Sequence, residues 1–224
     1  MTSTVLITGA NRGVGLALAR HYHAAGWAVI GVCRSGGEEV VELREVAETL
    51  IEGIDVTRPE DIEHLRSELA GRRMELLVNN AGMLRNESLG EIDFDSIREQ
   101  MEINAYAPLG VTEALLGNLS EGAKVANITS RMGSIADNDS GGRYGYRASK
   151  AALNAFGKSL AMDLKPRGIA VAQIHPGYVK TRMVNFGGLI SAEEAAAGIA
   201  QRIDELTLRT SGGFWHSNGE ELPW

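Results

Sequence analysis

A single cysteine, Cys33, occurs among the 224 residues of the chain. An internal disulfide framework is therefore excluded, and the composition fits a reducing compartment. No apolar stretch approaches the ~20 residues that a membrane-spanning helix requires. The first residues show no basic region followed by a long apolar run, which a secretory signal would need. We expect a cytoplasmic protein that associates with no membrane.

The chain also has too little positive charge for a general nucleic-acid-binding protein. Its formal net charge is -7 and its pI is about 5.3, whereas binding to a phosphate backbone depends on a surplus of Lys and Arg. His21 and His23 are two residues apart and on a helix would point to different sides, so they make a poor metal pair. No pair of carboxylates stands out from ordinary helix surface charge. We expect neither nucleic acid nor metal.

Short apolar runs alternate with longer segments of helical period, without internal repeats. Strands are predicted at residues 5–7, 28–33, 50–54, 76–78, 125–129, 169–174 and 213–216. Helices are predicted at residues 16–26, 43–47, 94–116, 144–164 and 192–206, with another beginning at Pro59 and a bend at Pro108. The alternation predicts an α/β fold: one domain over residues 1–224 with a Rossmann-type doubly wound parallel sheet of about seven strands. A ligand would bind at the carboxyl ends of the strands.

Three glycines, Gly9, Gly13 and Gly15, stand between the first predicted strand and the first predicted helix. Glycine at these places allows a tight turn, a close approach of the backbone to a phosphate, and close packing of helix on strand. The alternative is a glycine-rich turn without a ligand, and the motif alone is weak. Its place at the start of a βαβ pattern favours dinucleotide binding.

The end of the second predicted strand distinguishes NAD from NADP. An acidic residue there would bind the 2′-hydroxyl of the ribose and repel a 2′-phosphate, but this chain has Arg34. Arg12, inside the glycine loop, can reach the same corner, and guanidinium groups are good phosphate partners. The alternative is two solvated surface arginines. The pattern favours NADP(H), with NAD the less favoured cofactor.

Tyr146 and Lys150 are four residues apart, which places both on one face of a helix. A free phenol has a pKa near 10, and a nearby cation would lower it toward a value useful for acid–base catalysis. Such a pair also arises as an ordinary solvated helix face, so the spacing alone is weak.

The motifs together resemble the short-chain dehydrogenase/reductase family. They occur in the family's order and spacing over essentially the whole chain. The Arg34 position and the C-terminal residues 219–224 resemble those of its smaller members, C-factor-like proteins and Sniffer-type carbonyl reductases. The motifs that carry the resemblance are Thr8-Gly9, Gly13-Val14-Gly15, Asn79-Asn80-Ala81-Gly82, Ser130, Tyr146, Lys150 and Pro176-Gly177.

The resemblance implies an NADP-dependent oxidoreductase of the carbonyl reductase type that transfers a hydride between the nicotinamide and a carbonyl or alcohol. Tyr146 would be the general acid or base, and Ser130 would bind the substrate oxygen. Lys150 would hold the nicotinamide ribose and lower the pKa of Tyr146, and Asn104 would support a proton-relaying water. The implied cofactor-binding residues are Gly9, Asn11, Arg12, Gly13, Val14, Gly15, Arg34, Asp55, Val56, Asn79, Ala81, Gly82, Tyr146, Lys150, Pro176, Gly177, Val179 and Thr181.

Substrate-side features are less well defined by the sequence. Met132, Tyr178, Met183 and Phe186 would line a substrate pocket or belong to the core, and the loop at residues 136–142 would flank the substrate. Cys33 is expected to be a core residue rather than a nucleophile. Small and apolar residues at 105–116 and 151–164 predict a homodimer or homotetramer through those helices. The alternative function is a C-factor-like signalling or redox-sensing protein that binds NAD(P) with little turnover.

Overall fold

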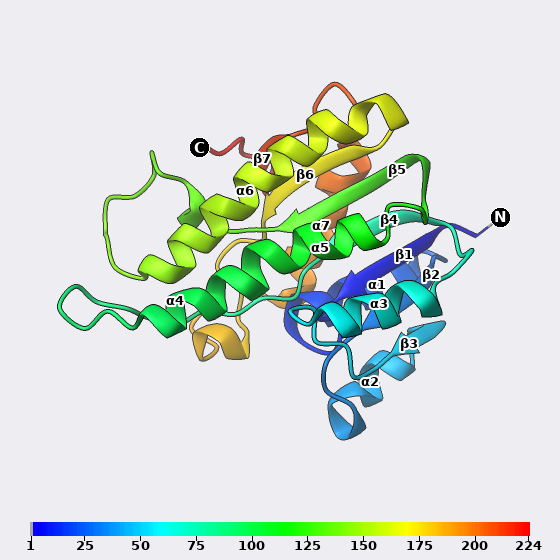
Figure 1. Cartoon of the computed structure of the whole chain (residues 1–224), viewed down its shortest axis with the longest axis horizontal. Coiled ribbons are helices and arrows are strands. Elements are labelled where there is room, and N and C mark those ends of the chain that lie inside the picture. The colour runs from blue at the N-terminus through cyan, green and yellow to red at the C-terminus, as the bar shows by residue number, and fades with distance from the viewer. Residues whose placement is uncertain (1) are drawn as a thin grey trace.

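The computed structural model describes residues 2–224, and Met1 lies outside the described residues. One seven-stranded sheet forms the centre, in the order β3-β2-β1-β4-β5-β6-β7, and every neighbouring pair is parallel (Figure 1). The predicted doubly wound sheet in a single domain is confirmed. Its strands are β1 (Thr4–Thr8), β2 (Ala28–Val32), β3 (Thr49–Ile51), β4 (Met74–Asn79), β5 (Leu119–Ile128), β6 (Ala170–His175) and β7 (Gly213–His216).

Helices cover both faces of the sheet, because alternate strand residues point to opposite faces and both sets are apolar. Val5 and Ile7 of β1 belong to one buried cluster, with residues of α1 and α7, while Leu6 belongs to the other, with residues of α3, α5 and α6. Figure 1 shows α4, α5 and α6 in front of the sheet and α1 and α7 behind it. The helices are α1 (Gly13–Ala24), α2 (Val41–Arg44), α3 (Pro59–Glu68), α4 (Phe94–Met101), α5 (Ala107–Ala114), α6 (Tyr144–Leu164) and α7 (Ala192–Glu205).

The long helix predicted at residues 94–116 is interrupted. A π-helical turn, η2 (Glu102–Tyr106), separates α4 from α5. Pro108 follows it, and proline has no N–H to donate to the carbonyl four residues earlier, which is that of Asn104. The predicted bend at Pro108 therefore takes the form of a π-turn that ends just before the proline, and it contains a predicted site residue.

Some predicted boundaries were also wrong. β5 begins at Leu119 rather than at residue 125, and its pairing with β4 shifts register between Met74 and Leu76. The polar residues near Glu121 are exposed, so the start of the strand has no apolar signature. β3 ends at Ile51 and α2 at Arg44, each earlier than predicted. No helix within residues 2–224 is both long and apolar enough to cross a bilayer.

Candidate active site

An open cleft of about 950 Å³ lies beyond the carboxyl ends of the strands. Segments that follow β1, β2, β4, β5 and β6 line it, as does one face of α6. All predicted site residues line this cleft except Gly15 and Asn79. A doubly wound sheet concentrates ligand contacts at this edge, because its helices leave the carboxyl ends of the strands open.

The glycine loop is held against the end of β4. Gly9 has φ +62°, and a Cβ there would come within 2.9 Å of the Ala81 Cα. At Gly15 a Cβ would lie 2.2 Å from the Gly9 carbonyl oxygen. Gly15 therefore acts by letting α1 close against the loop rather than by lining the cleft.

Asn79 and Asn80, at the end of β4, make the hydrogen bonds that stabilise the surroundings of the glycine loop. The buried Asn79 amide donates to Thr112 Oγ1 at 3.0 Å and to Asn127 Oδ1 at 2.9 Å, so its side chain joins β4 to α5 and β5. The Asn80 amide donates to the carbonyls of Thr8 at 3.0 Å and Gly9 at 3.1 Å. Asn80 also lines the cleft. Of the two, Asn80 is the residue that fixes the glycine loop.

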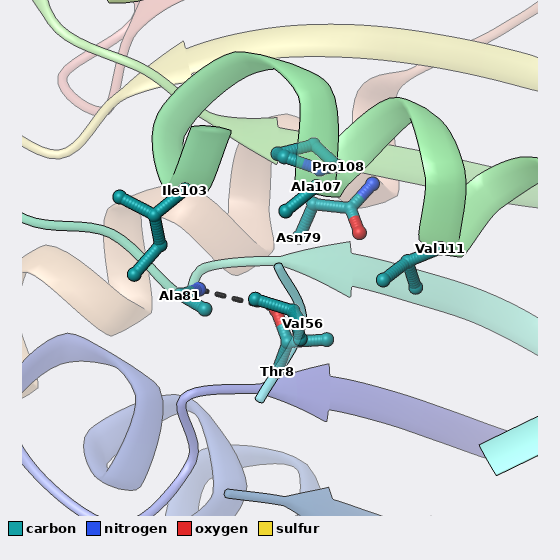
Figure 2. Close-up of a pocket in the computed structure, with 8 residues that line it drawn as sticks. All are labelled: Thr8, Val56, Asn79, Ala81, Ile103, Ala107, Pro108 and Val111. Carbon is teal, nitrogen blue, oxygen red and sulfur yellow. Dashed lines mark hydrogen bonds between the residues drawn. The ribbon is translucent and has the colours of Figure 1, made fainter. Parts of the chain in front are cut away.

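Figure 2 shows the contact behind this loop, where Thr8, Val56, Asn79, Ala81 and α5 meet. The Thr8 hydroxyl accepts hydrogen bonds from the backbone N–H groups of Asn80 at 3.0 Å and Ala81 at 3.1 Å. The side chains there leave no room for a ligand. This is a packed joint between β1 and β4 rather than a binding site.

Arg34 and Asp55 form the corner beyond β2 and β3. The Arg34 guanidinium lies 3.5 Å from the Asp55 carboxylate, and its side chain is 68% exposed. Partial burial raises the pKa of Asp55, but hydrogen bonds from Thr57 and the adjacent Arg34 outweigh it and lower the pKa overall. An exposed guanidinium and an ionised carboxylate thus stand side by side where the predicted adenosine ribose would lie.

Tyr146 and Lys150 lie on consecutive turns of α6, and Ser130 follows the end of β5. All three are buried and line the cleft. Burial raises the pKa of Tyr146, and a hydrogen bond with Ser130 and the charge of Arg143 act in the opposite direction. The sequence interpretation expected Lys150 to lower this pKa, whereas in the structure burial outweighs every lowering influence.

The Lys150 ammonium donates to the carbonyl of Ile128 at 2.9 Å and lies 5.9 Å from the centre of the Tyr146 ring. Burial lowers the pKa of Lys150 to about 8. The lysine is therefore anchored to the end of β5 and can exchange a proton near neutral pH.

Asn104 sits within the π-turn, fully buried. Its amide nitrogen donates to the Met83 carbonyl at 2.8 Å and to Ser149 Oγ at 3.0 Å, and its amide oxygen accepts from the Met83 N–H at 2.9 Å. This network joins the segment after β4 to the turn of α6 that carries Lys150. Asn104 therefore fixes α6 as well as lining the cleft.

Comparison with known proteins decides the family. The family model described as short chain dehydrogenase matches residues 3–187. The chain belongs to the short-chain dehydrogenase/reductase family. It is 42% identical over 228 residues to 1-hydroxy-2-glutathionyl-2-methyl-3-butene dehydrogenase of Rhodococcus sp. (strain AD45), covering 99% of this chain and 100% of that protein. It is also 42% identical over 154 residues to C-signal of Myxococcus xanthus, covering 67% of this chain and 93% of that protein.

The NADPH-bound carbonyl reductase from chicken fatty liver has the same fold, with a TM-score of 0.90 and 31% sequence identity. The match covers 100% of this chain and 99% of that one. The chain is thus an oxidoreductase of this family, with carbonyl reductases of known structure among its neighbours.

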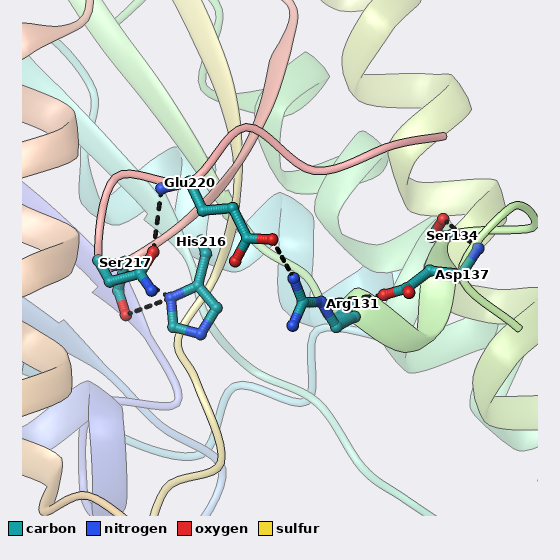
Figure 3. A network of polar contacts seen from close by, with 7 residues as sticks. Arg131, Ser134, Asp137, His216, Ser217 and Glu220 are labelled. Carbon is teal, nitrogen blue, oxygen red and sulfur yellow. Dashed lines mark hydrogen bonds and ion pairs between the residues drawn. The ribbon is translucent and has the colours of Figure 1, made fainter.

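Met132, Tyr178, Met183 and Phe186, which were expected to line a substrate pocket or belong to the core, line the cleft and are not buried. The loop at residues 136–142 does not line the cleft, contrary to the sequence expectation. The start of this loop is linked to the C-terminal segment instead, because Arg131 pairs with both Asp137, at 2.9 Å, and Glu220, at 2.5 Å (Figure 3). The Trp224 carbonyl accepts from Ser134 Oγ at 2.9 Å.

Two residues that meet where α6 begins, Glu87 and Arg143, were not predicted from the sequence. Glu87 is buried at 3% exposure, and its carboxylate accepts hydrogen bonds from Ser96 Oγ at 2.8 Å, Gln100 Nε2 at 2.6 Å and the Gly145 N–H at 3.1 Å. Arg143 lines the cleft and precedes α6. No local sequence pattern marks Glu87 as a site residue, because its partner Gly145 is 58 residues away. Arg143 could have been found from its position three residues before Tyr146. Cys33 is buried at the end of β2, among the residues of the core.

Proposed function

We propose that this chain is an NADP(H)-dependent oxidoreductase that transfers a hydride between the nicotinamide and a carbonyl or alcohol carbon. The observation that carries the proposal is the meeting of Ser130, Tyr146 and Lys150 in a cleft that continues to the glycine loop. The residues fit a dinucleotide, because backbone replaces side chains where a phosphate would approach: a Cβ at Gly9 would collide with Ala81. Bound NADPH would supply the hydride.

Tyr146 is the general acid in reduction and the general base in oxidation. Its phenol is shielded from water and hydrogen-bonded with Ser130, so a substrate oxygen placed between them is oriented by Ser130 and protonated by Tyr146. Lys150, with its pKa lowered to about 8, holds the nicotinamide ribose and exchanges protons on the same side. Asn104 fixes the helix turn that carries Lys150 and supports a water in the relay.

NADP(H) is proposed over NAD(H) because Arg34 and Arg12 line the adenosine end of the cleft. A guanidinium binds a 2′-phosphate through charge-assisted hydrogen bonds. Asp55, beside Arg34, acts against a phosphate, but its carboxylate already accepts from Thr57 N at 3.0 Å and Thr57 Oγ1 at 2.7 Å. The NADPH in the chicken carbonyl reductase supports the same choice.

The substrate is proposed to be a small carbonyl or alcohol compound. The dehydrogenase of Rhodococcus sp. extends this proposal to alcohols borne by a glutathione conjugate, since the two chains match over essentially their whole lengths. The decisive experiment tests a panel of aldehydes, ketones and glutathione-conjugated alcohols as substrates. Turnover is measured as the change in NADPH absorbance, which falls when a carbonyl is reduced and rises when an alcohol is oxidised. Turnover of any class above background supports an enzyme, and its absence across the panel contradicts one.

A signalling or redox-sensing role is the second candidate, because C-signal of Myxococcus xanthus matches two thirds of the chain. A protein that only binds the cofactor has no need of a buried Ser130, Tyr146 and Lys150 set. The same panel separates the two functions: cofactor binding by NADPH fluorescence with no turnover favours the second.

We propose a cytoplasmic homodimer or homotetramer that contacts its own copies through the outer faces of the long helices. Phe94 of α4, Tyr106 of the π-turn and Met162 of α6 are exposed apolar side chains there. Tyr106 and Phe156 pack ring against ring, with their centroids 6.1 Å apart, which makes part of this face rigid. Exposed apolar side chains on such a face are typical of an interface between copies.

A further inference from the structure

Arg143 is an arginine that lines the same cleft as Tyr146. It precedes α6 directly and lies three residues before Tyr146. Its charge acts on the Tyr146 phenol, and its side chain lines the cleft together with Met132 and Ser130. A substrate whose oxygen reaches Tyr146 therefore shares the cleft with this guanidinium.

The guanidinium of Arg143 has only weak partners in the chain. Nε donates to Asn86 Oδ1 at 3.0 Å, and Nη1 contacts the thioether sulfur of Met132 at 3.7 Å. Within residues 2–224 no carboxylate forms an ion pair with it. Glu87, whose backbone carbonyl accepts from the Arg143 N–H, has a buried carboxylate that is already bound to Gly145, Gln100 and Ser96. The exposed Arg143 guanidinium therefore still has N–H groups that can donate hydrogen bonds to a ligand.

Arg131 provides the contrast on the other side of the same opening. It also lines the cleft, but Asp137 and Glu220 both pair with it (Figure 3). Its charge is balanced by the chain itself. Arg143 is accordingly the unneutralised arginine beside the catalytic tyrosine.

The backbone of Arg143 is also costly to maintain. It has φ +49° and ψ +47°, a left-handed conformation that a side chain other than glycine rarely adopts. Gly141 and Gly142 before it also have positive φ, and the Arg143 N–H donates to the Glu87 carbonyl at 2.9 Å. The chain therefore holds an arginine where a glycine would be easier, which is typical of residues retained for function.

We propose that Arg143 is a substrate-binding residue that takes a carboxylate of the substrate, so that the preferred substrates are carbonyl or alcohol compounds bearing an anionic group. This inference rests on the proposed oxidoreductase function and specifies its substrate class. The carbonyl lies between Ser130 and Tyr146, and the carboxylate receives a bidentate pair of N–H bonds from the guanidinium. A substrate with both groups is held at two points, which fixes its reacting carbon.

The test compares aryl keto acids, with one to three methylene groups between ketone and carboxylate, with the methyl esters of the same acids. Turnover with NADPH and binding to the NADP⁺ complex, by calorimetry, are both measured. For the spacer that fits, the acid should exceed its ester about tenfold in kcat/KM and in affinity, the lower end for a charged hydrogen bond at an exposed site.

Arg143→Gln should reduce the acid-to-ester ratio to about one, and Arg143→Lys should leave it intermediate, because an ammonium is a cation without the planar fork. Gln keeps an unbranched side chain at the left-handed position, so the backbone cost is similar. The matched control is Arg147→Gln: Arg147 bonds Ser140 Oγ at 2.8 Å, does not line the cleft, and its loss should leave the ratio unchanged.

The outcomes are distinct. A parent enzyme that treats acid and ester alike, or an Arg143→Gln variant that loses both equally, overturns the substrate role and leaves Arg143 as a group that tunes the Tyr146 pKa. If no ketone is reduced, the proposed oxidoreductase function fails, and the calorimetric ratio still decides whether Arg143 binds carboxylates.

Discussion

The Lys150 ammonium lies 5.9 Å from the centre of the Tyr146 ring while donating a hydrogen bond to the Ile128 carbonyl, 2.9 Å away. The lysine is therefore held by the strand end and not by the phenol. Burial raises the pKa of Tyr146 and lowers that of Lys150 to about 8. Between these two groups, Lys150 is the one whose protonation changes first as the pH rises from neutrality.

Replacing Tyr146 with phenylalanine should remove nearly all turnover. The phenol delivers the proton, and general acid–base groups contribute roughly 10²–10⁴-fold to rate. Cofactor affinity, measured by NADPH fluorescence, should change little, because the residues proposed to hold the dinucleotide, the glycine loop and the arginines, line another part of the cleft. Tyr144→Phe, at an exposed position on the first turn of the same helix, is the control and should remain active. More than about a tenth of parental kcat/KM in Tyr146→Phe would exclude it as the proton donor.

Reduction should slow as the pH rises above about 8. Lys150 is protonated below its pKa of about 8 and loses its charge above it. In the proposed mechanism the neutral amine no longer favours the cofactor ribose or supplies a proton toward Tyr146, so kcat/KM should fall by about tenfold per pH unit once the group is deprotonated. The measurement is kcat/KM for a ketone between pH 6.5 and 10. If kcat/KM stays level until Tyr146 itself ionises, the pH dependence comes from the phenol and not from Lys150.

Stability should decrease as the pH falls below 6.5, because of His175. Burial, together with His216, Arg131 and Lys150, lowers the pKa of His175 to about 3, so the unfolded chain takes up a proton that the folded chain refuses. Between pH 6.5 and about 3 the unfolded state therefore binds more protons, and the free energy of unfolding falls by roughly 1.4 kcal/mol per pH unit.

Urea unfolding at several pH values measures this slope, and His175→Asn should flatten it. His216, whose ring centroid is 4.8 Å from that of His175, has a lowered pKa as well and should add a smaller part in the same direction. Equal slopes in the parent and in His175→Asn would show that the acid sensitivity comes from other groups.

The fold could be read from the sequence because its strands are continuous apolar runs buried on both faces. The glycine loop and the Tyr146–Lys150 pair were readable because each lies within one turn or helix. Asn104, by contrast, meets Ser149 across 45 residues, and Glu87 meets Gly145 across 58. Such contacts depend on how α4, the π-turn and α6 pack together, and no local pattern encodes that packing.

The direction of the Tyr146 pKa shows the same limit. Spacing on a helix predicts a cation near the phenol, but the net shift depends on how much water the surrounding segments exclude. The pairing of Arg34 with Asp55 was likewise invisible, because the two residues follow different strands that become neighbours only in the sheet.

Light scattering should give a mass of two or four copies at micromolar concentration. Met162 is 60% exposed on α6, and a charge placed there would be buried between copies if that face is the interface. Met162→Glu should therefore lower the mass, whereas Leu208→Glu, at an exposed apolar position between α7 and β7, should not. A parent protein that is monomeric would contradict the proposal.

NADPH should be preferred over NADH, with Arg34 as a main cause. The strand-end position lacks a carboxylate of its own, and the 68%-exposed Arg34 side chain makes a long contact of 3.5 Å with Asp55. Charge-assisted hydrogen bonds are worth roughly 1.5–3 kcal/mol each, or about ten- to hundredfold in affinity. Solvent exposure places the expected effect near tenfold.

The measurement is kcat/KM for both cofactors in the parent, in Arg34→Ala and in Asp55→Asn. Arg34→Ala should lose efficiency with NADPH and change little with NADH, because the 2′-hydroxyl makes no charged pair with it. Asp55→Asn should shift the preference further toward NADPH, since it removes a negative charge 3.5 Å from the guanidinium and leaves Arg34 to the phosphate. Equal losses of kcat/KM with both cofactors would show that Arg34 has a structural role, through its contact with Asp55, and does not bind the 2′-phosphate. A parent enzyme that prefers NADH would refute the proposed NADPH preference.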